Sequence, residues 1–329
     1  MLATLLILIF SIIAAESFTT KKYSLVMPNV QPNVDELYLC TPVKVNYTKN
    51  FYIVGFEPKA SMGTVHHMLL YGCQLPGSSQ EVWNCGEMVR DVEEDQHNPC
   101  KAGSQIIYAW ARDAPKLNLP ESVGFKVGGD SSIQYLVLQV HYAHSLHGAT
   151  DNSGVYLFYT EKLMPKLAGV LLLGTAGYIR PLSVEHMETA CTIDEDKVLH
   201  PFAFRTHTHQ LGKVVAGYRV RLENGRNEWT LLGKKNPQDP QMFYPIEKNL
   251  TVRQGDQLAA RCTMESHLYT TTFIGATNKD EMCNFYLMYW VEQSEPLSKK
   301  YCFTSGPPNY YWNNPGNLNN IPDGASSLN

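Results

Sequence analysis

Apolar residues along this chain fall in short runs that clusters of Gly, Pro, Asn and Asp separate at short spacings. Runs of this kind are typical of β-strands bounded by turns. No segment keeps a helical spacing over several turns. Examples of the runs are residues 52–54, 135–142, 155–159, 214–222 and 257–264. The pattern predicts an all-β chain built from two tandem antiparallel β-sandwich, jelly-roll-like domains.

The N-terminus differs from the rest of the chain. Its first 15 residues are apolar apart from one Thr and one Ser, and the small residues Ala14, Ala15 and Ser17 follow or end the run. The run is shorter than the roughly 20 residues that a membrane span needs. We therefore interpret residues 1–17 as a signal peptide. We expect no stable membrane insertion, and a location in the secretory pathway lumen, in secretory granules or outside the cell.

The remaining chain suits two domains of ordinary size. A polar break that contains proline, residues 160–166, separates two strand-rich halves. We expect an N-terminal domain over residues 22–162 and a C-terminal domain over residues 163–303. Residues 304–329 are rich in Pro, Asn, Gly and Ser and have little to bury, so we expect a disordered tail.

Composition limits the possible functions only weakly. The chain is 44% hydrophobic and 18% charged with a net charge of −4, and it has no basic patch for nucleic acid. Its eight cysteines, behind a signal peptide, indicate four disulfides whose pairing the sequence leaves open. Four cysteines precede residue 101 and four follow residue 190, which suggests bridges within each half. Asn46 and Asn249 begin possible glycosylation sequons.

Two segments of strand-like sequence contain residue types found in metal sites. They are residues 205–209, Arg-Thr-His-Thr-His, and residues 282–286, Met-Cys-Asn-Phe-Tyr. Side chains alternate between the two faces of a strand. One face of the first segment therefore holds Arg205, His207 and His209, and one face of the second holds Met282, Asn284 and Tyr286. If the two faces meet, two imidazoles and a thioether surround one ion.

The ligand types indicate which metal this site favours. Neutral imidazoles suit zinc, copper, iron or nickel, whereas a thioether favours Cu(I), so His207 and His209 with Met282 indicate a redox copper. The guanidinium of Arg205 would bind a carboxylate beside the metal. A secreted zinc hydrolase is a rival hypothesis, but it requires a carboxylate ligand or base near the metal.

Three more histidines lie in the first half of the chain. His66 and His67 are adjacent and precede an apolar run, and His141 lies near the end of an apolar strand. Adjacent residues of a regular strand point to opposite faces, so His66 and His67 can share an ion only where the strand is twisted or bulged. A site of three imidazoles without a soft ligand would hold zinc, or a copper used for electron transfer.

These segments resemble the signatures of the copper type II, ascorbate-dependent monooxygenase family. The matching stretches are residues 64–70, 139–142, 207–209 and 280–284, in the order found in that family. The resemblance implies two copper ions, one in each of two β-sandwich domains facing across a cleft, with ascorbate as electron donor and dioxygen as co-substrate. It assigns His66, His67 and His141 to the centre that supplies an electron. It assigns His207, His209 and Met282 to the centre where dioxygen and substrate react.

Residues beside the second centre distinguish two branches of this family. Peptidylglycine α-hydroxylating members act on the α-carbon of a C-terminal glycine, and dopamine β-monooxygenase-like members act on a benzylic carbon of an amine. Arg205, Asn284 and Tyr286 match carboxylate-binding residues of the first branch, and an amine substrate has no carboxylate. The resemblance therefore implies hydroxylation of glycine-extended peptides to peptidyl-α-hydroxyglycine, the first step of amidation in neuropeptide processing. An amine hydroxylase and a catalytically silent secreted copper-binding protein are the alternatives.

The resemblance also implies how the cysteines pair and how amidation is completed. The implied disulfides are Cys40–Cys85, Cys73–Cys100, Cys191–Cys302 and Cys262–Cys283. The last of these lies beside Met282 and would fix that segment. Few residues follow Cys302, so we expect a monofunctional hydroxylase whose product is cleaved by a lyase on a separate polypeptide.

Overall fold

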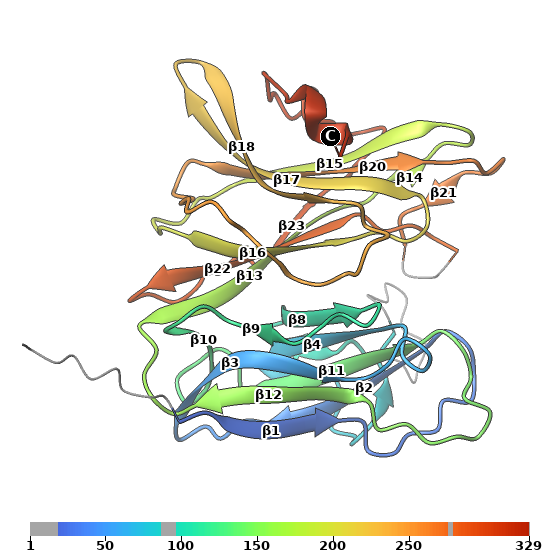
Figure 1. The fold of residues 1–329 in the computed structure, drawn as a ribbon, viewed down its shortest axis with the longest axis vertical. Helices are drawn as coiled ribbons and strands as arrows, with labels where there is room; N and C mark the ends of the chain where they lie inside the picture. The colour runs from blue at the N-terminus through green and yellow to red at the C-terminus, as the bar shows by residue number, and fades with distance from the viewer. Residues whose placement is uncertain (1–18, 87–96, 276–278, 329) are drawn as a thin grey trace, which may run out of the picture.

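The computed structural model describes residues 19–86, 97–275 and 279–328, which fold into two β-rich lobes (Figure 1). The expected signal peptide, residues 1–17, lies outside the described residues. One short 3-10 helix, η1 (Asp323–Ser326), accompanies the strands in the described part of the chain. No helix within those ranges is long and apolar enough to cross a membrane. The all-β, two-domain prediction is confirmed.

The first domain is a sandwich of two layers. One layer contains β1 (Lys21–Val26), β12 (Gly154–Thr160), β3 (Asn50–Lys59) and β10 (Val123–Gly128), with the short β9 (Leu117–Asn118) paired to β3. The other contains β6 (Trp83–Asn84), β2 (Leu37–Lys44), β11 (Tyr135–Tyr142), β4 (His67–Cys73) and β8 (Gln105–Ala111). Two short strands, β5 (Leu75–Pro76) and β7 (Cys100–Ala102), pair separately.

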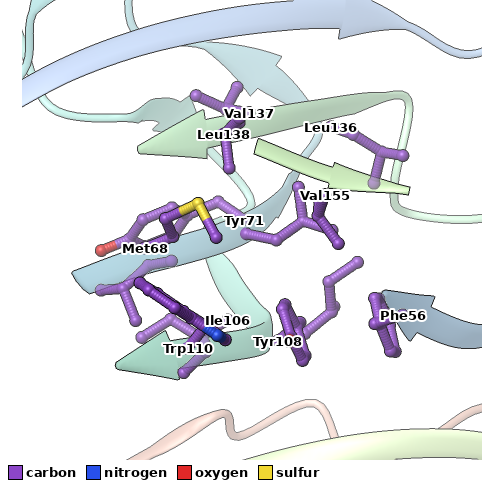
Figure 2. Packing of buried hydrophobic residues seen from close by; sticks show 14 of the residues in the cluster. Phe56, Met68, Tyr71, Ile106, Tyr108, Trp110, Leu136, Val137, Leu138 and Val155 are labelled. Atoms are coloured by element: carbon purple, nitrogen blue, oxygen red, sulfur yellow. The ribbon is translucent and has the colours of Figure 1, made fainter. Parts of the chain in front are cut away.

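Aromatic and branched apolar residues fill the space between these two layers. Phe56 of β3 stacks on Tyr108 of β8, with ring centroids 4.6 Å apart and planes 3° from parallel (Figure 2). Strands β4, β8 and β11 are buried along nearly their whole length. A strand that is buried on both faces needs apolar residues at successive positions. For this reason apolar and polar residues do not alternate regularly along these three strands.

The second domain repeats the two-layer plan. One layer contains β13 (Lys166–Thr175), β22 (Asn284–Glu292), β16 (His200–His207) and β19 (Tyr244–Pro245), with β23 (Tyr301–Thr304) parallel to β13. The facing layer is β15 (Val184–Thr192), β20 (Gln257–Glu265), β17 (Gly212–Glu223) and β18 (Arg226–Lys235). A small ribbon pairs β14 (Tyr178–Ile179) with β21 (Thr272–Phe273).

The two domains share one continuous sheet, because β10 and β13 form a short parallel pair at Val123↔Lys166. Strands β16 and β22 therefore have one face in the core of the second domain and the other against the first domain. Phe204 and Phe285 belong to the second core, whereas Tyr286 packs with residues of the first. Strands β16 and β22 lie in the layer of the second domain that is nearest the first domain (Figure 1). Alternate side chains of these strands therefore lie at the contact between the domains.

All eight cysteines are paired, each within its own half of the chain. The pairs are Cys40–Cys85, Cys73–Cys100, Cys191–Cys302 and Cys262–Cys283, which confirms the pairing that the family resemblance implies. The last bridge joins Cys283, the residue between Met282 and the start of β22, to Cys262 of β20. Four disulfides are typical of secreted or luminal proteins.

The C-terminal segment, residues 304–328, packs on the second domain, so the prediction of a disordered tail is wrong for these residues. Trp312 is fully buried. Its Nε1–H donates to the main-chain oxygen of Thr189 at 2.9 Å, and its ring lies 4.5 Å from the Arg261 guanidinium carbon. The polar composition of the segment concealed a small core in which Trp312, Leu318 and Ala325 are buried.

Candidate metal centres

Three imidazoles of the first domain converge. His67 begins β4 and lies opposite His141 in the neighbouring strand β11. The Nδ1 atom of His66 lies 3.2 Å from Nδ1 of both His67 and His141, and the latter two are 3.4 Å apart. The predicted three-histidine set is therefore brought together by the pairing of β4 with β11.

His66 joins this set because it stands outside the strand. It occupies a bend directly before β4, after a turn in which the N–H of Val65 donates to Ser61 O at 2.9 Å. The N–H of His66 then donates to His141 O at 2.9 Å. The alternation of faces that would separate His66 from His67 does not apply in the bend.

The three nitrogens fit a metal ion in spacing and in charge. With distances that average about 3.3 Å, the centre of the triangle lies about 1.9 Å from each nitrogen. Metal–imidazole bonds are about 2.0–2.1 Å long. Burial, followed by the nearby His66 and His209, lowers the pKa of His141 to about 3. Burial also holds the pKa of His67 well below its usual value. These imidazoles are therefore neutral near pH 7, which is the form that can bind a metal.

His207 and His209 carry the second pair of imidazoles, at the end of β16 and just after it. His207 Nδ1 lies 2.7 Å from Gln241 Oε1, and His209 Nδ1 lies 2.9 Å from the main-chain oxygen of Asp280. Both partners are acceptors, so each Nδ1 carries the proton and each Nε2 is left to bind a metal. The donor set fits a metal at this position as well.

Gln241 belongs to the candidate second centre and was not found by the sequence analysis. Its Nε2 donates to Thr208 O at 3.3 Å and to Pro237 O at 3.2 Å, which fixes the direction of the amide. Its Oε1 therefore accepts from His207. Gln241 lies in the loop between β18 and β19, and nothing in the local sequence marks that loop as part of a metal site.

The segment that contains Met282 is held next to His209 by Glu281. The buried Glu281 carboxylate accepts main-chain N–H groups of His209, Leu211 and Met282, the last two at 2.7 and 2.8 Å. Met282 Sδ lies 3.8 Å from Asn284 Nδ2. Met282 lines a pocket of about 430 Å³, whereas His207 and His209 line a neighbouring one of about 130 Å³. The role of Met282 as a third ligand stays a prediction.

Arg205 lies opposite Tyr286 in the β16–β22 register and is 2% exposed. Its Nε–H donates to the main-chain oxygen of Gln241 at 2.9 Å and its Nη2 to Gln241 Oε1 at 3.2 Å. The guanidinium carbon lies 5.1 Å from the centre of the Tyr286 ring. Burial lowers the pKa of Arg205. Within the described residues, no carboxylate forms an ion pair with this guanidinium.

The two histidine sets face each other across the contact between the domains. The ring centroids of His67 and His207 are 6.3 Å apart. Both residues line the pocket of about 130 Å³, together with Arg112 and Gln241. Arg112 also crosses the contact by donating from Nη2 to Gln238 Oε1 at 3.0 Å. The two candidate centres thus lie on either side of one small pocket.

Family models match this chain over most of its length. The N-terminal domain of the copper type II ascorbate-dependent monooxygenases matches residues 23–149, and the C-terminal domain of the same family matches residues 166–315. The chain belongs to the copper type II ascorbate-dependent monooxygenase family. The histidines of each candidate centre fall within a different one of these two matched domains. Family membership implies copper as the metal and ascorbate and dioxygen as the other reactants.

Several relatives in this family have known names. The chain is 39% identical over 304 residues to peptidyl-glycine alpha-amidating monooxygenase A of Xenopus laevis, covering 90% of this chain and 31% of the relative. It is 41% identical over 300 residues to peptidylglycine alpha-amidating monooxygenase of Rattus norvegicus, and the match covers 89% of this chain and 29% of the relative. It is 30% identical to human dopamine beta-hydroxylase, and the match covers 83% of this chain and 46% of that relative. The chain thus spans about three tenths of the length of the amidating relatives.

Proposed function

We propose that this monooxygenase hydroxylates the α-carbon of a C-terminal glycine in peptides, giving peptidyl-α-hydroxyglycine. The proposed reactants are a glycine-extended peptide, dioxygen and ascorbate. The proposed metal ligands are His66, His67 and His141 for one copper ion and His207, His209 and Met282 for the other. When bound, the copper ions supply the one-electron chemistry that activates dioxygen and breaks the glycine C–H bond.

The observation that carries the proposal is the environment of Arg205. A buried guanidinium without an acidic partner is costly, and an anionic ligand would offset that cost. The planar fork of arginine suits a carboxylate in particular. Arg205 lies beside His207 on one face of the sheet, so a carboxylate bound there would hold its own α-carbon near the second centre.

Tyr286 and Asn284 are proposed to hold the rest of the peptide terminus. Both are buried on β22 and line the pocket of about 430 Å³, together with Met282. The phenol of Tyr286 can donate to the carboxylate, and the Asn284 amide can pair with a peptide group. Arg205 on β16 and Asn284 and Tyr286 on β22 lie on two paired strands. These three side chains would therefore hold the substrate with little freedom, which favours reaction at one carbon.

The amine-hydroxylase alternative is less well supported. A phenylethylamine has no carboxylate to offset the charge of Arg205, and identity is 39–41% to the amidating relatives against 30% to dopamine beta-hydroxylase. A silent copper-binding protein would need neither a buried cation nor a 430 Å³ pocket beside its metal site. Both alternatives remain outcomes of the test below.

We also propose how the product and the protein are handled. Hydroxyglycine peptides would be cleaved by a separate peptidyl-hydroxyglycine lyase. The disulfides favour the secretory pathway, and the substrate class favours secretory granules within it. Asn46 and Asn249 are both exposed and would be open to glycosylation there.

The test is mass spectrometry of products. Copper-loaded protein is incubated with ascorbate, dioxygen and an N-acylated peptide ending in glycine, with tyramine in a parallel reaction. We expect the peptide to gain one oxygen atom without conversion to the amide. Oxygen on tyramine alone would favour the amine hydroxylase, and no product from either substrate would favour the silent copper-binding protein.

A further inference from the structure

Glu36 lies at the outer edge of the His66, His67 and His141 set. Its Oε2 is 2.9 Å from His141 Nε2. The Nδ1 atom of His141 points into the three-histidine set, so Nε2 is the nitrogen that carries the proton and donates it to the carboxylate. Glu36 thus selects the tautomer of His141 that presents a free Nδ1 to a metal.

The local backbone is shaped to keep this contact. Glu36 has φ of 56°, in the left-handed region that residues other than glycine seldom adopt. Two residues later, Tyr38 pairs with His141 across β2 and β11, and the two rings stack 4.0 Å apart and 4° from parallel. His141 is therefore held along its edge by Glu36 and across its face by Tyr38.

The second centre uses neutral acceptors in the same role. The imidazole of His207 donates to the amide oxygen of Gln241, and that of His209 donates to the main-chain oxygen of Asp280. The buried Glu281 carboxylate nearby accepts from main-chain N–H groups rather than from an imidazole. The cation Arg205 is bonded to the same Gln241 oxygen as His207.

We infer that Glu36 is a positioning residue that fixes His141 for copper and lowers the reduction potential of the first-domain centre, which the family resemblance already assigns as the electron donor. A carboxylate bonded to a ligating imidazole raises the basicity of that ligand. Its negative charge favours the more highly charged Cu(II) over Cu(I). With copper bound at both sites, an electron given up at the first centre would be used at the second and would be replaced by one from ascorbate. This direction of transfer rests on the proposed function, whereas the positioning of His141 does not.

The test measures copper at the first centre by itself. In full-length protein carrying His209→Ala, which removes a ligand from the second centre, Glu36 is changed to Ala or to Gln. Cu(II) and Cu(I) affinities are measured by chelator competition, and the reduction potential by redox titration, without peptide. The control is Glu57→Gln, a partly exposed carboxylate of the same domain bonded to Lys22 at 3.3 Å.

We expect Glu36→Ala to lower Cu(II) affinity at this centre by about 10–100-fold. Glu36→Gln keeps an acceptor for His141 but removes the negative charge. We therefore expect the affinity for Cu(II) to fall about tenfold relative to the affinity for Cu(I). That tenfold change corresponds to a reduction potential of the first centre about 59 mV higher than in the parent protein. The Glu36 side chain is 39% exposed, so neither change leaves a closed cavity, and melting temperatures should stay close to the parent's.

Each outcome bears on one part of the inference. Unchanged Cu(II) affinity in Glu36→Ala overturns the positioning role, and an unchanged potential in Glu36→Gln overturns the effect of the Glu36 charge on the reduction potential. A parent protein that binds no copper at its first-domain histidines overturns both. No peptide takes part, so a failure of the proposed function would appear separately, as missing product in the peptide assay.

Discussion

The side-chain oxygen of Gln241 accepts a hydrogen bond from His207 Nδ1 at 2.7 Å and another from the Arg205 guanidinium at 3.2 Å. One buried amide therefore joins a candidate copper ligand to the candidate carboxylate-binding residue. The amide cannot shift to follow one partner without weakening its bond to the other, so the two sites should respond together when Gln241 is changed.

Replacing Gln241 by Ala tests this link. Loss of the acceptor leaves His207 Nδ1–H unpaired and frees the ring to rotate, so copper affinity at the second centre should fall about 10–100-fold. Copper at the first-domain histidines should be unaffected. Copper stoichiometry and competition titrations measure both values. Gln254→Ala, at an exposed glutamine that donates to Asp194 O at 2.8 Å, is the control. Equal copper affinity in the two variants would contradict the role of Gln241.

Changes at Arg205 test the carboxylate clamp. Arg205→Lys keeps a charge but loses the planar fork, and Arg205→Ala loses both. A hydrogen bond to a charged group is worth about 1.5–3 kcal/mol, so we expect KM for a glycine-extended peptide to rise about 10–150-fold in Arg205→Ala. Steady-state kinetics measure the change. Arg180→Ala, at an exposed arginine paired with Glu185, is the control. An unchanged KM would move the carboxylate site elsewhere.

Met282→Ile separates packing from metal binding. The exchange keeps a similar volume, and such swaps usually cost less than about 1.5 kcal/mol, so the melting temperature should change little. The proposed thioether ligand is lost, and we expect no hydroxylated product by mass spectrometry. Met288→Ile, at a buried methionine further along β22, should keep activity. Full activity in Met282→Ile would remove Met282 from the ligand set.

Trp312→Ala tests whether the C-terminal segment is part of the second domain. Truncation of a buried tryptophan costs about 3–5 kcal/mol. We expect a clear fall in melting temperature, while copper binding to the folded protein is kept because Trp312 contacts neither histidine set. Leu328→Ala, at a residue 52% exposed, serves as the control. A melting temperature equal to that of the control would show that the packing of the segment adds no stability.

The metal-free protein should lose stability in acid. The pKa of His141 is about 3 in the folded chain against an ordinary value of 6.5. Between these values the unfolded chain binds the extra proton, so stability is fully present above about pH 6.5 and falls as pH drops towards 3. The slope is at most about 1.4 kcal/mol per pH unit for each such histidine. Thermal unfolding between pH 7.5 and 4.5 measures it, and His141→Ala should have a shallower slope than the parent.

Much of the site could be predicted from the sequence because strand periodicity is a local property. The alternation that grouped Arg205 with His207, and Asn284 with Tyr286, holds in the structure, where these residues are neighbours across β16 and β22. The alternation of strand faces does not apply to His66, because His66 lies in a bend directly before β4. The prediction for the C-terminal segment was wrong because its polar composition does not reveal that Trp312 is buried in a small hydrophobic core.

The sequence by itself determined the strands, the candidate ligand types and the metal class, because spacing and side-chain chemistry lie along the chain. The tertiary structure decided which groups orient those candidate ligands. Glu36 meets His141 from 105 residues away, and Gln241 meets His207 from 34 residues away. Such contacts depend on which strands become neighbours and on where the loops between them return. For the same reason, only the packing of the two domains brings His67 and His207 to either side of one pocket.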